Sequence, residues 1–344
     1  MRLALPALLT VVLAAPAIAQ TQGVHRIIRV TDRLWVAEPR FGGANASIIA
    51  EDGYTVLVDP HSDPATARAL AEEALAITQQ PIRYVINTHW HGDHHGGNRA
   101  LTELYLDQIT FIAHPNTKRD IVDEATPELR RMGGFYATFA DRAEAALAKG
   151  SFEDGSPISA QQRDQIAAYA TELRAFVESS GDYEYHLPEI TVDSRITLGD
   201  LEVLHIGLWA HTEGDLVVRL RDANIMIVGD LLTAPYVVPR SGYPRAYAET
   251  IRQLIARNPS AYVLGHGGPV KRGHAFAETM ADFLDAVSDW AEKHPVGPAE
   301  DAVNDAAIAA FEDRINWEEP GLTFLDFPGL VAMTLSRARI EIGD

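Results

Sequence analysis

The sequence predicts a layered fold that mixes strands and helices. In the first 114 residues, runs of β-branched and aromatic residues alternate with helical stretches, in the order strand, helix, strand, helix, strand. Strands return after residue 200, and amphipathic helices follow them. Of the 344 residues, 47% are apolar, which is enough to build one large domain or two medium ones.

The element boundaries follow from apolar periodicity and from turn residues. The strand at 54–58 ends at Asp59-Pro60, and Asp63 is expected to cap a helix that has Pro64 at its first position. The expected strands lie within 27–37, 46–58, 82–86, 110–113, 201–206, 215–220, 225–229 and 261–264. Helices are expected at about 64–79, 245–257, 274–293, 299–313 and 329–339.

The segment 115–185 differs in composition from the rest. It is rich in Ala, Glu, Asp, Arg and Gln, and its periodicity predicts at least two helices, at about 137–149 and 160–178. Because the segment shows no dense apolar set of its own, we expect a helical insertion within a single domain that spans 20–344. Residues 295–344 are expected to form a C-terminal helical extension of that domain.

Residues 1–19 have the pattern of a secretory signal peptide. Arg2 precedes a short apolar run that ends in the A-x-A cleavage site Ala17-Ile18-Ala19. A membrane anchor is the alternative, but the run is short for a membrane span and contains two prolines. We therefore expect cleavage after Ala19 and a soluble mature protein that is periplasmic or secreted.

The formal net charge of −19 argues against two classes of partner. Nucleic acids and anionic lipids both attract basic surfaces, so we expect no nucleic-acid partner and no membrane docking after signal cleavage. A small-molecule substrate remains, and the oligomeric state is open. The chain has no cysteine, so any metal site must use imidazole and carboxylate ligands.

The strongest functional signal is the stretch NTHWHGDHHGG, which begins at Asn87 and follows a strand. His89 and His91 are two residues apart, so both can point the same way from an extended segment. Asp93 and His94 come after a glycine, where the chain can turn. Such a loop can direct two imidazoles at one cation, and a carboxylate and an imidazole at a second.

Three later elements place residues of the same types at strand ends. His211 follows a strand at a turn, Asp230 ends a buried apolar strand, and His266 lies between glycines after another strand. A carboxylate at the end of a buried strand is costly unless it is paired or bound to a metal. Each residue alone is weak evidence, but together with the histidine-rich stretch they predict a site for two metal ions.

The pattern H-x-H-x-D-H, followed in order by His211, Asp230 and His266, resembles the metallo-β-lactamase-fold hydrolase superfamily over roughly residues 27–114 and 195–270. The resemblance implies an α+β fold, a four-layer αββα sandwich with its metal site at one edge of two facing sheets. The helical insertion and the C-terminal helical tail would be additions to that sandwich. The resemblance further implies three sets of ligands: His89, His91 and His211 for one metal, Asp93, His94 and His266 for the other, and Asp230 as a bridge.

Four further residues are candidates around this site. By the resemblance, Asp59 is expected to support the metal-bound histidines from behind, with a turn residue as the alternative. His95 is expected to play a similar supporting or a structural role. Tyr236 and Tyr243 could line the substrate pocket and donate a hydrogen bond to an oxyanion, or could equally pack beneath their loop.

The implied chemistry is metal-assisted hydrolysis. Two divalent ions would lower the pKa of a shared water, and the bridging hydroxide would attack the substrate while Asp93, the expected catalytic residue, orients it and shuttles a proton. Two zinc ions per chain suit this ligand set best, and iron or manganese are alternatives.

The substrate stays open among esters, lactones, thioesters and β-lactams. Asp230 stands where true β-lactamases of the superfamily usually have cysteine or serine, which disfavours a lactamase, whereas export favours one. An iron-dependent dioxygenase-like oxidoreductase of the same fold is one alternative, although the full ligand set argues for two metals. A non-catalytic periplasmic metal-binding accessory protein is the other, although no part of the motif is degraded.

Overall fold

The computed structural model describes residues 21–296, 300–316 and 325–343. The expected signal peptide, residues 1–19, lies outside the described residues. Within the described ranges, no helix has both the length and the apolar character needed to cross a membrane.

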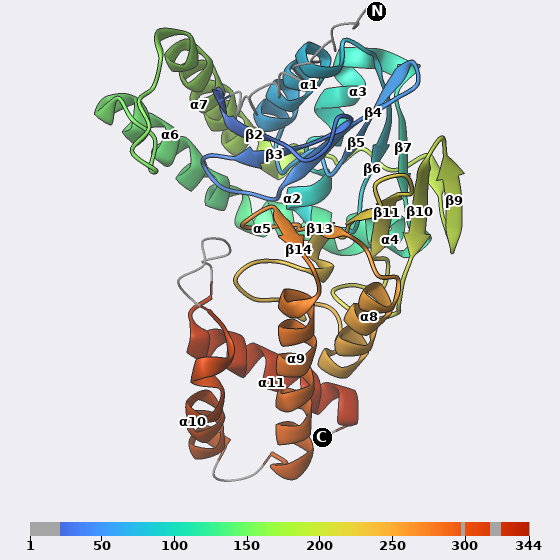
Figure 1. Cartoon of the computed structure of the whole chain (residues 1–344). Coiled ribbons are helices and arrows are strands. Elements are labelled where there is room, and N and C mark those ends of the chain that lie inside the picture. The colour runs from blue at the N-terminus through green and yellow to red at the C-terminus, as the bar shows by residue number, and fades with distance from the viewer. Residues whose placement is uncertain (1–20, 297–299, 317–324, 344) are drawn as a thin grey trace, which may run out of the picture.

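Two β-sheets form the centre of the described chain (Figure 1). The first has the strand order β1 to β8, antiparallel as far as β5 and parallel from β5 onward. Its strands are β1 (Thr21–Gln22), β2 (His25–Arg29), β3 (Leu34–Pro39), β4 (Ala46–Glu51), β5 (Tyr54–Val58), β6 (Ile82–Ile86), β7 (Thr110–Ala113) and β8 (Ile190–Thr191).

The second sheet has the order β14-β13-β12-β11-β10-β9, and only its β12–β13 pair is parallel among the described strands. Its strands are β9 (Arg195–Leu198), β10 (Leu201–His205), β11 (Leu216–Leu220), β12 (Ile225–Ile227), β13 (Ala261–Val263) and β14 (Val270–Arg272). The strands β1, β8, β9 and β14 were not expected from the sequence.

Helices cover the outer face of each sheet, which gives four layers. Helices α1 (Pro64–Thr78) and α3 (Asn98–Tyr105) pack on the first sheet, and α8 (Pro244–Ala256) and α9 (Ala275–Lys293) pack on the second. Short helical turns complete this part of the chain: α2 (Gly92–His95), η1 (Leu106–Gln108) and η5 (Gly229–Leu231). The expected αββα sandwich is confirmed.

Strand β5 illustrates why an almost wholly apolar strand is needed in this position. Side chains alternate along a strand, so Val56 and Val58 enter the core between the two sheets while Leu57 enters the core beneath α1. The next helix begins as the sequence predicts. The Asp63 carboxylate accepts a hydrogen bond from the backbone N–H of Thr66, and Pro64 occupies the first turn of α1.

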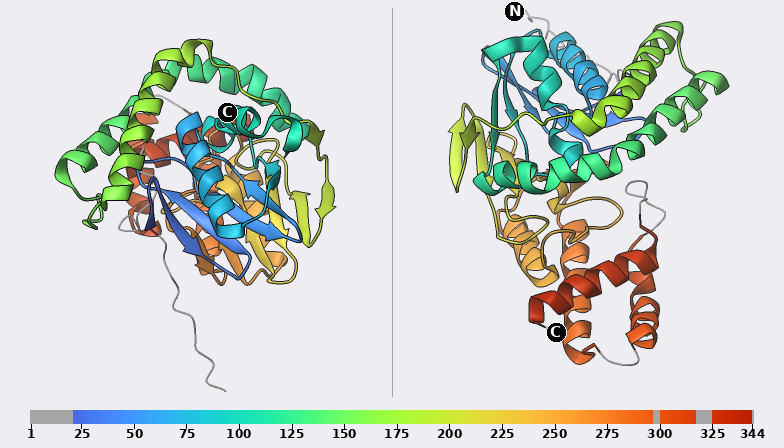
Figure 2. Two further views of the ribbon diagram at one scale, coloured as in Figure 1. Left: turned by 90° about the horizontal axis from the view of Figure 1, so that it is seen from above. Right: turned by 180° about the vertical axis from the view of Figure 1, so that it is seen from behind.

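Between β7 and β8 the chain forms a helical segment that projects to one side of the sandwich (Figure 2). It comprises α4 (Pro115–Asp120), η2 (Ile121–Ala125), α5 (Thr126–Met132), η3 (Gly133–Tyr136), α6 (Ala137–Lys149), α7 (Ala160–Ser179) and η4 (Ser180–Asp182). The expectation that this segment lacks a dense apolar set is wrong. Ile121, Ile166 and Leu173 are fully buried in a cluster that aromatic residues from α6, α7 and the following loop complete.

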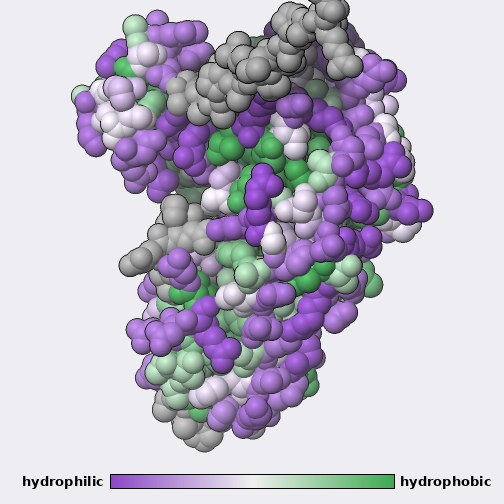
Figure 3. Space-filling model, viewed as in Figure 1, coloured by the Kyte–Doolittle hydropathy of each residue, from purple (hydrophilic) through white to green (hydrophobic). Residues whose placement is uncertain are grey.

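The C-terminal helices form the end of the molecule that lies away from the first sheet (Figures 1 and 2). They are α10 (Glu300–Phe311), η6 (Glu312–Arg314) and α11 (Phe327–Ile342). Phe311, Leu330 and Leu335 share one core with α8 and α9. The face in Figure 3 is largely hydrophilic, with apolar side chains gathered over the first sheet and among these helices.

Candidate metal centre

Seven histidine and aspartate side chains meet where strands of both sheets end. His89 and His91 follow β6, Asp93 and His94 lie in α2, and the remaining three follow strands of the second sheet: His211, Asp230 and His266. Helix α2 packs very closely on the turn after β5. A Cβ atom at Gly96 would lie 2.0 Å from the carbonyl oxygen of Ser62, so only glycine allows this approach.

The first donor cluster consists of His89, His91, His211 and Asp230. Nδ1 of His91 lies 3.0 Å from Nε2 of His89 and 2.9 Å from Nε2 of His211. An Asp230 oxygen, Oδ2, lies 3.5 Å from Nε2 of His211 and 4.0 Å from Nε2 of His89. Three ring nitrogens and a carboxylate oxygen thus converge on one point.

Hydrogen bonds behind the rings fix the tautomers of two of these histidines. The His211 Nδ1–H donates to the carbonyl oxygen of Val238 at 2.8 Å. Thr88 gives its hydroxyl hydrogen to Asp59, so its oxygen accepts from the His89 Nδ1–H at 3.0 Å. In the neutral rings, Nε2 of both His89 and His211 therefore carries a lone pair that points into the cluster.

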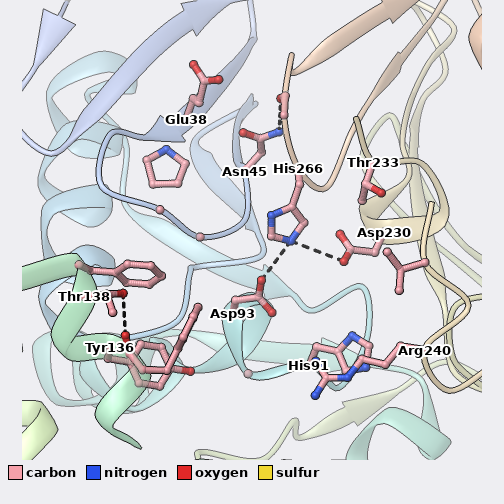
Figure 4. A pocket seen from close by; sticks show the side chains of 18 of the residues that line it. Glu38, Asn45, His91, Asp93, Tyr136, Thr138, Asp230, Thr233, Arg240 and His266 are labelled. Carbon is pink, nitrogen blue, oxygen red and sulfur yellow. Dashed lines mark hydrogen bonds and ion pairs between the residues drawn. The ribbon is translucent and has the colours of Figure 1, made fainter. Parts of the chain in front are cut away.

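The second donor cluster consists of Asp93, His94 and His266. Nε2 of His266 lies 3.0 Å from Oδ2 of Asp93, and Nε2 of His94 lies 3.8 Å from Oδ1 of the same carboxylate. Asp230 joins this cluster to the first, because Nε2 of His94 and Nε2 of His266 lie 3.3 Å and 3.5 Å from its two oxygens. Figure 4 shows Asp230 and Asp93 on either side of His266.

The two clusters differ in the acid–base state that the fold imposes. Burial lowers the pKa of His89 and His91 well below 6.5 and that of His211 to about 4, so these rings are neutral. Burial also opposes a charge on His94, but the carboxylates of Asp230 and Asp93 outweigh it and raise the pKa of His94 well above 6.5. The pKa of His266 is raised for the same reason.

The donor set fits metal ions. Among the described residues, Nε2 of His94 and Oδ1 of Asp230 face the donor clusters and are buried without a hydrogen-bond partner. Buried polar atoms are normally satisfied, so two orphaned atoms in one place call for a missing partner. Imidazole nitrogens and carboxylate oxygens are ligands of zinc, iron and manganese, and a cation is the one partner that all of these lone pairs can share.

Asp59 lies directly behind the donors. Its carboxylate accepts hydrogen bonds from the backbone N–H of Thr88 at 2.8 Å, from the Thr88 hydroxyl at 2.8 Å and from the His94 Nδ1–H at 2.9 Å. It therefore orients His94 directly and His89 through Thr88. This position matches the supporting role that the sequence suggests for Asp59.

His95 points away from both clusters. Its Nε2–H donates to the carbonyl oxygen of Trp90 at 2.7 Å, and its ring meets Tyr185 edge-on, with ring centroids 4.5 Å apart. Burial lowers its pKa to about 4, so the ring is neutral. Of the two roles considered for His95, the structure places it in the structural one.

Tyr236 and Tyr243 are not among the described residues that line the cavity over the donors. The Tyr236 hydroxyl donates to the carbonyl oxygen of Leu325 at 3.1 Å, in the core beside the C-terminal helices. Tyr243 precedes α8 and packs against Trp209 and the guanidinium of Arg337. Of the two roles that the sequence leaves open for these tyrosines, these contacts agree with packing beneath their loop.

The cavity has a volume of about 570 Å³ and opens over both donor clusters. Its walls include residues that the sequence did not single out, above all Tyr136 and Tyr185 from the inserted segment and Arg240 from the loop after Asp230. Arg240 lies beside His91 in Figure 4 and forms an ion pair with Glu128 of α5. No motif marks these residues, because only the fold brings them to the site.

The comparisons with known proteins agree with this geometry. Residues 39–266 match the family model described as the metallo-beta-lactamase superfamily. The chain is similar in fold to a metallo-beta-lactamase from Erythrobacter litoralis, with 17% identity, a TM-score of 0.53 and coverage of 77% of this chain and 97% of that one. It is also similar to the mono-zinc form of FIM-1 from Pseudomonas aeruginosa, with 15% identity, a TM-score of 0.52 and coverage of 77% and 96%.

Two curated relatives match a shorter part of the chain. One is a beta-lactamase-like protein 2 homolog from Caenorhabditis elegans, 28% identical over 27% of this chain. The other is an atrochrysone carboxyl ACP thioesterase from Claviceps purpurea (strain 20.1), 30% identical over 24% of this chain. The matches span only 33% and 28% of those relatives. With its family model, its αββα layers and its paired donor clusters, the chain belongs to the metallo-beta-lactamase superfamily.

Proposed function

We propose that the protein is an exported hydrolase that uses two metal ions, zinc in the first instance, to cleave an ester, lactone, thioester or β-lactam. The position of Asp230 carries this proposal, because one carboxylate faces the histidines of both donor clusters. When bound there, two divalent cations would activate water and polarise the bond that is cleaved.

The chain's own residues have distinct tasks in this reaction. His89, His91 and His211 offer three neutral nitrogens to one cation, and Asp93, His94 and His266 offer a mixed set to the other. The side chain of Asp93 is 33% exposed, whereas that of Asp230 is only 9% exposed. Asp93 is therefore the carboxylate best placed to accept a proton from the attacking water and return it to the leaving group.

The substrate class is supported less sharply than the metal site. Members of the superfamily are generally hydrolytic, and one curated relative is named a thioesterase. A solved structure with the same fold is described as mono-zinc, which makes occupancy of the second cluster a separate question. The signal-peptide pattern at residues 1–19 supports export.

Metal analysis of the purified protein beside a hydrolysis screen tests the proposal. The screen uses nitrocefin, a lactone, an aryl ester, a thioester and an aryl phosphodiester. We expect close to two zinc ions per chain and turnover of one of the first four compounds. One iron per chain, oxygen uptake and a silent screen would instead indicate an oxidoreductase.

A further inference from the structure

Two tyrosine hydroxyls from the inserted segment lie directly over the donor loop. A Cβ atom at Gly92 would lie 2.9 Å from the Tyr185 hydroxyl oxygen and 3.4 Å from that of Tyr136. The backbone at Gly92 needs no glycine for its conformation, since its φ is not positive. The glycine between His91 and Asp93 is therefore explained by the close approach of the Tyr185 hydroxyl.

Both hydroxyls face the same glycine of the donor loop, between His91 and Asp93. Each phenol has one hydrogen to donate. Both tyrosines line the cavity together with Asp93, although their exposure is only 9% and 8%. The pair can thus donate a phenolic hydrogen to a group that enters the cavity.

The packing around the pair holds it rigidly. Tyr136 meets Phe176 edge-on, with ring centroids 5.5 Å apart, and Tyr185 meets His95 at 4.5 Å and Tyr183 at 5.6 Å in the same manner. A donor fixed before the substrate arrives costs little reorganisation when the substrate binds.

We propose that the pair formed by Tyr136 and Tyr185 is the hydrogen-bond donor that positions the acyl oxygen of the substrate, so that the inserted segment is part of the active site. This inference rests on the proposed hydrolase function and commits it to substrates with an acceptor oxygen beside the cleaved bond. The phenolic hydrogen stays on the tyrosine throughout, so the pair positions the substrate and takes part in no proton transfer.

Three Tyr→Phe variants of the metal-loaded protein test the proposal with p-nitrophenyl butyrate as the substrate. We expect Tyr136→Phe and Tyr185→Phe each to lower kcat/KM by about 10- to 100-fold, because each breaks a donor to a developing charge. The loss in the double variant should be smaller than the product of the two single losses, because both hydroxyls serve the same oxygen. Tyr169→Phe is the matched control, since Tyr169 is buried in the same apolar cluster but is not among the described residues that line the cavity.

Two further measurements separate positioning from structure. Metal content and Tm should stay at the level of Tyr169→Phe in all three variants. Calorimetric binding of phenylphosphonate, which presents anionic oxygens without being hydrolysed, should weaken about tenfold in Tyr136→Phe and Tyr185→Phe. Loss of metal together with activity, or variants that match Tyr169→Phe in both turnover and binding, would overturn the proposal.

The binding measurement also distinguishes this inference from the proposed function. If the wild-type protein hydrolyses nothing in the screen but binds phenylphosphonate through the two tyrosines, the hydrolase proposal fails while the oxygen-binding role of the pair is supported. If it neither hydrolyses nor binds, both proposals fail.

Glycine substitutions give an independent check. Gly92→Ala should displace the Tyr185 hydroxyl and lower kcat/KM as Tyr185→Phe does. Gly134→Ala lies in the same turn as Tyr136 and meets no atom within 4 Å, so it should be silent. Equal activity of the two alanine variants would count against the proposal.

Discussion

The two donor clusters are neighbours, yet the fold balances their charges in different ways. In the first cluster, lone pairs of buried, neutral imidazoles point toward one another. The low pKa values of these histidines keep the rings unprotonated at neutral pH. In the second, carboxylates raise the pKa of His94 and His266, so protons can balance the charges. The first is thus built for a cation, whereas the second can exchange its cation for protons.

Asp230→Ala should have the largest effect, because it removes the carboxylate that both clusters share. Metal catalysis supplies several kcal/mol of stabilisation, so kcat should fall by about 1,000-fold or more. Metal content should drop in both clusters, as measured by atomic emission on the dialysed protein. Asp32→Ala, at a fully exposed carboxylate, is the control. A variant with full metal content would contradict the bridging position of Asp230.

Asp59→Asn should weaken the second cluster most. The amide cannot accept from His94 and Thr88 as the carboxylate does, and removing such supporting partners costs about 10- to 100-fold in metal affinity. Competition with a chromophoric chelator at neutral pH measures this loss. Unchanged affinity would show that His94 keeps its tautomer without Asp59.

Lowering the pH should empty the clusters in a fixed order. In the metal-free protein, His94 and His266 bind protons at a higher pH than usual, so a metal ion must displace them as the pH falls. Affinity of the second cluster should therefore fall by about tenfold per pH unit for each proton displaced. His211, with a pKa of about 4, keeps the first cluster free of proton competition until lower pH. Chelator titrations between pH 8 and pH 5 should thus find two phases, and a single phase would remove the distinction.

Thr88→Val should have the smallest effect and act on the first cluster. It removes the acceptor of the His89 Nδ1–H, and one neutral hydrogen bond contributes about 0.5–1.5 kcal/mol, or roughly 2- to 10-fold in affinity. The chelator titration resolves this change if the first phase shifts and the second does not. A larger shift in the second phase would mean that Thr88 acts mainly through Asp59.

The sequence predicts most strands of the sandwich and the common site of the donor residues, because local sequence patterns mark both. Strand residues such as those of β5 are β-branched and apolar, and the donors stand directly after strands, where a few residue types are conspicuous. The short turn of helix at Gly92–His95 was expected only as a loop, since its shape depends on packing against the turn after β5.

The cavity walls could not be predicted in this way. Tyr136 and Tyr185 are distant in the sequence from the donor loop and from each other, and only the path of the inserted segment unites them. Tyr236 and Tyr243 lie closer in sequence to Asp230 but face other elements. The apolar cluster of the insertion was not predicted, because alanines and widely spaced aromatic residues form much of it.

The donors follow strands of both sheets, and this has a consequence for how the molecule holds together. A cation bound to His91 and His211, or to Asp93 and His266, ties the N-terminal half of the sandwich to the C-terminal half. Because an unfolded chain lacks the convergent site, the bound ion adds to the free energy of unfolding in proportion to the logarithm of its free concentration. The free metal concentration around the protein would then determine its Tm, independently of any substrate.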